Sequence, residues 1–413
     1  MQPNRLDRQL RIAGWNQKAL ENATVGVVGD NDLLASLYVM SASALGIDNV
    51  IVIAPRLDPK LIEIAKKLNP RFTLTCLEGF CTHPVMADLF KACNLIVDLS
   101  HYGLANKLLL AKGYRENIPI IRGFCYEEHD EQGFKIFTYI KGREWQELEA
   151  ILAPNNLPNG HFDDGVLDTI ISGIMLEETK NLLMDQDVSD NLISYKRKKL
   201  KLQNSQPKIL VVGSGALGIF VGLGLAFSKF QDITFMDPDI VEVTNLNRQV
   251  LFYNAIGRKK ADTLTERLNW LFNMNHKAQV AYFDKDTDIT SYDVVFDCVD
   301  NFKSRILLSE KCLDLGKTLI SGGTSAAAGQ AVTYDPATDD IAPAKLLGLY
   351  DIVAKRDPED YRRQRAACIY QADPSVIMTN QITAGFMVDS HRMLLDGQKP
   401  ENIFYDSASS RRF

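Results

Sequence analysis

The stretch of sequence that decides the fold is residues 208–218, which read KILVVGSGALG. A short apolar run passes into a glycine-rich turn, and an apolar helical pattern follows the turn. A second apolar run, residues 233–236, comes next and ends at Asp237. An apolar run, a turn, a helix and another apolar run make a βαβ unit. Continuous apolar strands that alternate with helices predict a parallel sheet covered on both faces.

The same plan occurs earlier in the chain, where residues 24–29 read TVGVVG and residues 50–55 read VIVIAP after a helical pattern. The parallel continues downstream, where two further pairs of segments correspond: 95–100 with 294–299, and 118–123 with 317–322. We therefore predict an α/β fold with two Rossmann-like, doubly wound domains that form a pseudo-dimer.

The expected domain boundaries follow from this repeat, with residues 1–195 as the first domain and residues 208–413 as the second. Residues 196–207 begin with a basic run beside a polar, proline-containing stretch, and we interpret them as a solvated linker rather than a binding patch. Residues 336–370 are charged, contain several prolines and show little periodicity, which predicts a long crossover loop.

Charge and cysteine content exclude several classes of protein. The net charge of −6 gives no reason to expect a nucleic-acid partner, because proteins that bind nucleic acid usually have a basic face. No apolar run is long enough to span a bilayer, and the N-terminus is charged where a signal peptide is apolar, so we expect no membrane partner. The seven cysteines are scattered without a Cys-x-x-Cys pair, which favours a reducing cytoplasm over disulfides or a structural zinc site.

The carboxyl ends of the strands in the second half carry the residues typical of a nucleotide site. Gly213, Gly215 and Gly218 permit a tight turn and let backbone N–H groups approach phosphates at a helix N-terminus. Asp237 ends the next strand, where a carboxylate can bond ribose hydroxyls. A nicotinamide-dependent oxidoreductase would explain these residues, but it would leave Arg248 unused, whereas a nucleotide triphosphate needs such a cation.

Five motifs narrow the choice of protein class. They are G-S-G-A-L-G, D-P-D, N-L-N-R-Q, G-R-K-K-A and V-D-N, in this order between residues 213 and 301. Together with an R-Q pair at residues 8–9, they resemble the adenylation domain of ubiquitin-activating enzymes and their relatives, among them ThiF and the molybdopterin-synthase adenylyltransferase. The resemblance covers nearly all of residues 204–400. It implies binding of ATP and Mg²⁺.

The resemblance also implies a role for each matching residue. Arg248 and Lys260 would bind the triphosphate, Asp300 would hold Mg²⁺, and Arg8 would be supplied from the opposite half. Such cations suit a reaction in which a carboxylate attacks a phosphate, because anion meets anion. The implied nucleotide contacts are Gly213, Gly215, Gly218, the ribose ligand Asp237, Asp239, Asn245, Arg248, Gln249 and Lys260.

Each of these residues also has a structural interpretation. Arg8 could be a surface arginine that pairs with Asp7 or Glu21, and Asp300 could be a helix N-cap. Lys260 competes with its neighbours Lys259 and Arg258. Asp297 could be a neighbour of the metal ligand or a buried structural carboxylate. The functional and the structural interpretation of each residue both stay open at this point.

The first half is predicted to be inactive. Alignment of Gly29 with Gly213 puts Asn31 and Leu34 where Gly215 and Gly218 stand, and a Cβ there obstructs phosphate approach. Ala54 falls opposite Asp237 and His101 opposite Asp300, so the carboxylates for ribose and Mg²⁺ are both missing. We therefore expect the first half to be a structural partner that donates Arg8 to the site of the second half.

Cys368 is the candidate nucleophile, because the family carries its thioester-forming cysteine in a crossover loop near this place. Three arginines, Arg362, Arg363 and Arg365, would favour its thiolate. Cys298 and Cys312 are expected to be buried structural cysteines, and a buried structural role is the alternative for Cys368 too. Cys125 is a weaker candidate in the degenerate half.

The expected activity is adenylation of the C-terminal glycine of a ubiquitin-like protein, a thioester on Cys368, and transfer to a conjugating enzyme. The compact size and the tandem halves resemble a prokaryotic ubiquitin-like conjugation system. The end at Phe413 without a ubiquitin-fold domain and the missing Cys-x-x-Cys pair depart from the family and support adenylation more firmly than transfer to a conjugating enzyme. The alternative is a sulfur-carrier-protein adenylyltransferase without protein conjugation. A peptide-tailoring enzyme that makes an acyl-phosphoramidate and a catalytically silent scaffold are further possibilities. The sequence does not decide the substrate or the oligomeric state.

Overall fold

The computed structural model describes residues 4–142, 161–201, 205–355 and 374–407. The first half builds a seven-stranded sheet in the order β3-β2-β1-β4-β5-β6-β7. Strands β1 to β5 pair in parallel, whereas β6 and β7 are antiparallel. The strands are β1 Thr24–Gly29, β2 Asn49–Ala54, β3 Thr73–Glu78, β4 Leu95–Leu99, β5 Ile120–Glu128, β6 Glu131–Tyr139 and β7 Ile193–Lys198.

The second half repeats this sheet in the order β10-β9-β8-β11-β12-β13-β14, with the same parallel and antiparallel pairs. Its strands are β8 Ile209–Val212, β9 Ile233–Met236, β10 Lys277–Gln279, β11 Val294–Asp297, β12 Thr318–Thr324, β13 Ala328–Tyr334 and β14 Ile403–Asp406. The predicted pair of doubly wound domains is confirmed.

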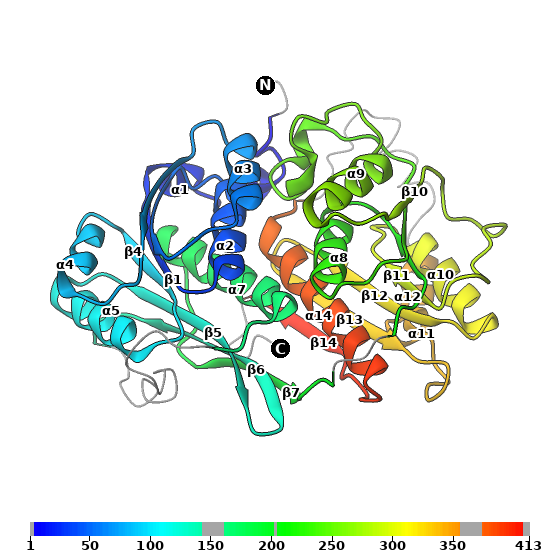
Figure 1. Ribbon diagram of the computed structural model, residues 1–413. Helices are drawn as coiled ribbons and strands as arrows, with labels where there is room; N and C mark the ends of the chain where they lie inside the picture. Colours follow the sequence, from blue (N-terminus) through cyan, green and yellow to red (C-terminus); the bar gives the residue numbers. More distant parts are fainter. Residues whose placement is uncertain (1–3, 143–160, 202–204, 356–373, 408–413) are drawn as a thin grey trace.

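Helices cover both faces of each sheet, as buried parallel strands require. Four of them lie between the two sheets, at the centre of Figure 1: α2 Asp32–Leu45, α7 Gly165–Leu183, α8 Ala216–Phe227 and α14 Ile377–Leu395. The outer faces carry α4 Pro84–Ala87, α5 Gly103–Glu116, α10 Phe302–Asp314, α11 Pro343–Leu346 and α12 Leu349–Lys355.

The remaining helices are α1 Gln17–Asn22, α3 Pro59–Leu68 and α9 Lys260–Phe272, with the 3-10 turns η1 Gln9–Arg11, η2 Asp88–Phe90, η3 Val243–Asn245 and η4 Val250–Phe252. Within the described ranges, no helix has the length and apolar character needed to cross a membrane.

Helices α7 and α14 pack closely against each other, and glycines permit the approach. A Cβ added at Gly173 of α7 would lie 2.8 Å from Cγ1 of Ile382, and one at Gly385 of α14 would lie 2.3 Å from Cγ1 of Ile170. Each glycine has the same position in its 19-residue helix, and both isoleucines are fully buried. A reciprocal contact of this kind is the pattern of a twofold interface, so the halves form the predicted pseudo-dimer.

Polar groups buried in this interface pair across it. Ser41 Oγ on α2 donates a hydrogen bond to Gln381 Oε1 on α14 over 2.9 Å. Gln381 Nε2 then donates to Ser172 Oγ on α7 over 2.6 Å. The amide thus satisfies both of its ends within the contact, as a buried polar group must.

A buried ion network also joins the halves. Arg197 on β7 bonds Asp389 of α14 at 3.0 Å and Asp164, the N-cap of α7, at 3.1 Å. Arg392 on α14 bonds Asp164 at 2.7 Å. Two arginines face two aspartates, so the buried charges balance and offset part of their desolvation cost. Burial alone would raise the pKa of Asp164, but Arg392 and Arg197 lower it to about 2.

The interpretation of the basic run as solvated linker was wrong. Residues 196–198 belong to β7, which pairs antiparallel with β6. Side chains alternate between the two faces of a strand, so Lys196 and Lys198 are exposed while Arg197 is buried. Because every residue of the run is basic, its composition does not indicate which of its side chains are buried.

Gly385→Ala should destabilise the protein, although alanine is the better helix former. Alanine in place of glycine stabilises a helix interior by about 1 kcal/mol, but overpacking against Ile170 costs roughly 1–3 kcal/mol. We expect a lower free energy of unfolding in urea. In Gly385→Ala/Ile170→Ala the two losses should be less than additive, because the second change makes room for the first. Fully additive losses would contradict a tight contact here.

Candidate active site

The glycine-rich turn joins β8 to α8, and its three glycines serve different purposes. Gly213 has φ of 98°, and a Cβ there would lie 2.5 Å from the carbonyl oxygen of Cys298. A Cβ at Gly218 would lie 2.0 Å from the carbonyl oxygen of Gly213. At Gly215 the nearest atom is Gln249 Nε2, 3.7 Å away. Gly213 and Gly218 are therefore needed by the chain itself, whereas Gly215 borders open space at the N-terminus of α8.

Asp237 lies directly beside this turn. Its carboxylate accepts hydrogen bonds from Ser214 N (2.7 Å) and Asp239 N (2.8 Å), and the residue is 6% exposed. Burial raises its pKa, and the nearby charge of Lys260 opposes this shift. The backbone donors hold the carboxylate at the carboxyl end of β9, where a ribose would lie in a nucleotide complex.

Lys260 begins α9 and reaches back to the D-P-D motif. Its Nζ donates to Asp239 Oδ2 at 2.9 Å. The neighbouring cations are engaged elsewhere: Lys259 Nζ donates to Pro238 O, and Arg258 pairs with Glu266. Of the three candidates, Lys260 is the one whose charge acts on Asp237.

Arg248 is buried at the meeting point of the two halves. Its NH1 donates to Thr244 O (2.9 Å) and Asn247 Oδ1 (2.8 Å). Burial and the charge of Arg8 together lower its pKa to about 9, while the charge of Asp300 acts in the opposite direction. Two arginines from different halves thus repel each other beside one carboxylate. An anionic ligand would relieve that repulsion.

The structural alternatives for these residues can now be compared with their contacts. Asp7 pairs with Arg11 at 2.6 Å and Glu21 pairs with Arg71 at 2.7 Å, so both suggested partners of Arg8 have another arginine. Asn301 caps α10 by accepting a hydrogen bond from Ser304 N, so capping does not account for the exposed Asp300.

Asp297 is a structural carboxylate. It is 1% exposed, accepts a hydrogen bond from Ser321 Oγ at 2.6 Å and has Arg305 NH1 at 3.8 Å. Burial raises its pKa, and Arg305 opposes the shift.

The sequence reading assigned no role to Gln9 and Asn247, which form a bridge between the halves. Asn247 Nδ2 donates to Gln9 Oε1 (3.1 Å) and to Ser375 O (3.0 Å). Gln9 Nε2 in turn donates to Leu45 O and to Gln17 Oε1. Because Arg248 bonds Asn247, this bridge positions the arginine. Both amides lie inside recognised motifs, R-Q and N-L-N-R-Q, which is the signal that could have identified them.

The residues fit a nucleotide. Ser214 Oγ and Gln249 Oε1 are buried and have no hydrogen-bond partner among the described residues, and both flank Gly215. Asn245 is buried with its Oδ1 accepting from Glu242 N. Unsatisfied buried polar atoms are costly, so their presence beside an open glycine cradle favours a polar ligand.

The structure describes three of the four cysteines considered in the sequence analysis. Cys368 and its three neighbouring arginines lie outside the described residues. Cys298 and Cys312 are buried as expected, and burial raises the pKa of each thiol. Cys125 is also buried, with a pKa raised well above the usual value by burial and by nearby aspartates.

Strand register confirms which positions correspond in the two halves. Val28 pairs with Ile53 and Asp98, as Val212 pairs with Met236 and Asp297. Ala54 and Asp237 are the residues that follow Ile53 and Met236, and His101 and Asp300 each stand three residues after Asp98 and Asp297. The register therefore matches Ala54 with Asp237 and His101 with Asp300, as the alignment predicted.

Asn31 occupies the place of Gly215 in the first half, and its side chain is engaged. It caps α2 through Leu33 N and Leu34 N and donates to Asp163 and Asp168. These contacts fill the position that is open beside Gly215.

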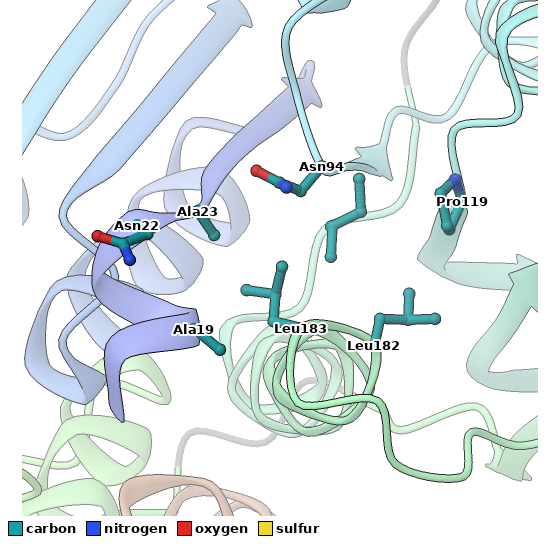
Figure 2. A pocket seen from close by; sticks show the side chains of 8 residues that line it. Ala19, Asn22, Ala23, Asn94, Pro119, Leu182 and Leu183 are labelled. Atoms are coloured by element: carbon teal, nitrogen blue, oxygen red, sulfur yellow. The ribbon is translucent and has the colours of Figure 1, made fainter. Parts of the chain in front are cut away.

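A hollow of about 320 Å³ lies elsewhere, and Figure 2 shows its lining. Asn94 and Pro119 precede β4 and β5, and Leu182 and Leu183 end α7. The hollow is therefore at the amino ends of the parallel strands of the first sheet, away from the candidate site of the second half. Among the described residues, no ionisable side chain lines it. We assign it no part in the chemistry.

Comparison with known proteins gives a family match. Residues 188–408 match the ThiF family. An adenylyltransferase and sulfurtransferase, uba4, of Aspergillus terreus is 35% identical over 142 residues, 33% of this chain and 29% of the relative. An adenylyltransferase and sulfurtransferase, MOCS3, of Culex quinquefasciatus is 35% identical over 142 residues, 33% of this chain and 32% of the relative.

A probable molybdopterin-synthase adenylyltransferase of Porphyra purpurea is 34% identical over 138 residues, 32% of this chain and 35% of the relative. The chain thus spans about a third of the length of these curated relatives. Among solved structures, E. coli MccB with ATP is 18% identical with a TM-score of 0.43, over 50% of this chain and 62% of that one.

Gly215→Ala should separate binding from folding. Its new methyl group meets nothing closer than 3.7 Å, so the free energy of unfolding should change by less than about 1 kcal/mol. The methyl group would stand in the space for a phosphate, and we expect at least tenfold weaker binding of a fluorescent ATP analogue. Gly218→Ala is the matched control, because its clash with Gly213 O should lower stability. Unchanged nucleotide affinity in Gly215→Ala would contradict a phosphate site at this turn.

Proposed function

The chain belongs to the ThiF family, and from that premise we propose that its second half transfers the adenylyl group of ATP to the C-terminal carboxylate of a small carrier protein. The observation that carries the proposal is the grouping of Arg8, Arg248 and Asp300 near an open glycine cradle. The curated relatives named as adenylyltransferases support the same reaction.

The reaction needs cations more than it needs acid–base groups. A carboxylate oxygen of the carrier attacks the α-phosphorus of ATP, a P–O bond forms, and the bond to the β-phosphate oxygen breaks. Pyrophosphate leaves with the electron pair, so no proton is transferred. Both reactants are anions, and preorganised positive groups stabilise the charge that spreads over the phosphate oxygens.

Each proposed role uses the contact already described. Asp237 would bind the ribose, because backbone donors hold its carboxylate in place. Lys260 would exchange its ion pair with Asp239 for the phosphates, with its ammonium kept close by that pair. Arg248 and Arg8 would face the triphosphate from the two halves, and Asn245 and Gln249 would contact it through their amides.

Mg²⁺ would be held by Asp300, an exposed carboxylate three residues after β11, and would neutralise phosphate charge when bound. The charge of Asp300 acts on Arg248, which supports a role for Asp300 beside the proposed phosphates.

The carrier is proposed to be a sulfur carrier of the ubiquitin-like type, whose acyl-adenylate then receives sulfur. The relatives that are both adenylyltransferases and sulfurtransferases favour this fate. The second candidate is a thioester on Cys368 followed by transfer to a conjugating enzyme, which rests on the cysteine and its three arginine neighbours in the sequence.

ATP–pyrophosphate exchange tests the adenylation step. With a carrier that ends in glycine, the native protein should exchange labelled pyrophosphate into ATP. Arg8→Ala and Asp300→Ala should each lower the exchange rate about a hundred- to a thousand-fold, because each removes charge from the transition state. Arg11→Ala is the control, because Arg11 belongs to the same N-terminal segment as Arg8 and pairs with Asp7 at 2.6 Å. Full exchange in Arg8→Ala would show that the first half does not contribute to the site.

Cys368→Ala separates the two fates of the acyl-adenylate. Sulfur-carrier activation predicts unchanged exchange and an unchanged yield of carrier thiocarboxylate, measured by mass spectrometry with a sulfur donor. Conjugation predicts unchanged exchange but loss of a reducible carrier–enzyme adduct on a gel. An adduct in the native protein that disappears in the variant would overturn the sulfur-carrier proposal.

A further inference from the structure

Three side chains that bind metals in proteins converge in the degenerate half. Asp30 follows β1, His101 follows β4, and His161 precedes α7. His101 Nδ1 lies 2.8 Å from Asp30 Oδ1, and His161 Nδ1 lies 4.0 Å from Asp30 Oδ2. One ligand atom from each residue lies within 4.8 Å of the others. We propose that Asp30, His101 and His161 bind a divalent transition-metal ion of the zinc class.

The orientation of both imidazoles supports this site. Each ring directs Nδ1 to Asp30, and the rings stack with centroids 4.1 Å apart and planes within 6°. The opposite nitrogens meet outer partners: His161 Nε2 lies 2.8 Å from Asp163 Oδ1, and His101 Nε2 lies 3.9 Å from Cys125 Sγ. Metal-bound histidines usually have a carboxylate at their second nitrogen, as His161 has in Asp163. Asn31 Nδ2 bonds the same Asp163 oxygen and fixes it.

Burial and charge also favour a cation. The side chains of Asp30, His101 and His161 are 3%, 7% and 18% exposed. Arg122, on which the charge of Asp30 acts, is itself paired with Asp98 at 3.2 Å. Two carboxylates, Asp30 and Asp163, thus remain for a dication to neutralise.

The chemical nature of the three donor groups determines which metal ion the site favours. Two imidazoles and a carboxylate suit zinc or cobalt, whereas Mg²⁺ prefers oxygen ligands alone. Tetrahedral zinc sets its nitrogen donors about 3.3 Å apart, so His161, the most exposed of the three, has to move roughly an ångström towards Asp30. Three protein ligands leave a fourth position for water.

Strand register relates this site to the other half. His101 occupies the position that Asp300 occupies in the second domain. The same edge of the same fold would therefore hold a transition metal in one half and Mg²⁺ in the other. The inference does not rest on the proposed adenylation, because it uses only residues of the first half.

Titration of untagged, chelator-treated full-length protein with Co²⁺ tests the site in the absence of nucleotide. The visible absorption of Co²⁺ is intense when its coordination is tetrahedral. We expect one equivalent per chain to give that band, and Zn²⁺ to displace it. His161→Asn and Asp30→Asn should abolish the band at the same metal concentration. Asp163→Asn should weaken binding about tenfold through the outer partner.

Two controls separate this site from others. His129→Asn changes an exposed histidine at φ of 53°, a conformation that asparagine accepts, and should leave the band unchanged. Asp300→Asn should also leave it unchanged while it removes the proposed Mg²⁺ ligand. His161→Asn is decisive if Asp30→Asn unfolds, which circular dichroism reports. No tetrahedral band, a band that survives His161→Asn, or a band lost in Asp300→Asn would overturn the proposal.

Discussion

The packing of α7 against α14 is the contact on which the rest of the structure depends. Gly173 and Gly385 let the two helices approach until each meets an isoleucine of the other half. The network of Arg197 and Asp389 then ties β7 to α14. Because this contact fixes one sheet against the other, the N-terminal segment of the first half reaches the carboxyl edge of the second sheet. The candidate active site is therefore a product of the interface, and neither half alone contains all of it.

Each half pairs a buried aspartate at the same strand position with an arginine, but the arginine comes from a different element in each half. Asp98 and Asp297 occupy equivalent strand positions and both are buried. Asp98 meets Arg122 from the neighbouring strand, with Asn106 from the following helix. For Asp297 the arginine, Arg305, comes from the following helix instead, and Ser321 stands on the neighbouring strand. The register makes these positions equivalent. The charge pair is thus kept while its arginine changes element, which is what the cost of an unpaired buried carboxylate demands.

The carboxyl edges of the two sheets have diverged for a simpler reason. An open position at Gly215 and a carboxylate at Asp237 leave room for a nucleotide in the second half. In the first half Asn31 fills the cradle, and Ala54 offers no carboxylate. The space instead holds the buried side chains around Asp30. The degenerate half nevertheless keeps its inner helices, because these carry the interface that positions Arg8 and Gln9.

The sequence by itself determined the fold class, the repeat and the edge of the sheet where the site lies. Short apolar runs and glycine turns are local signals, and parallel strands bring all their carboxyl ends to one edge. For the same reason the correspondence of Ala54 with Asp237 was predictable. Only the tertiary structure decided the bridge from Gln9 to Asn247, the burial of Arg197 and the meeting of Asp30 with His161. These contacts join residues far apart in the chain, and they depend on how sheets and helices are rotated against one another, which no local pattern encodes.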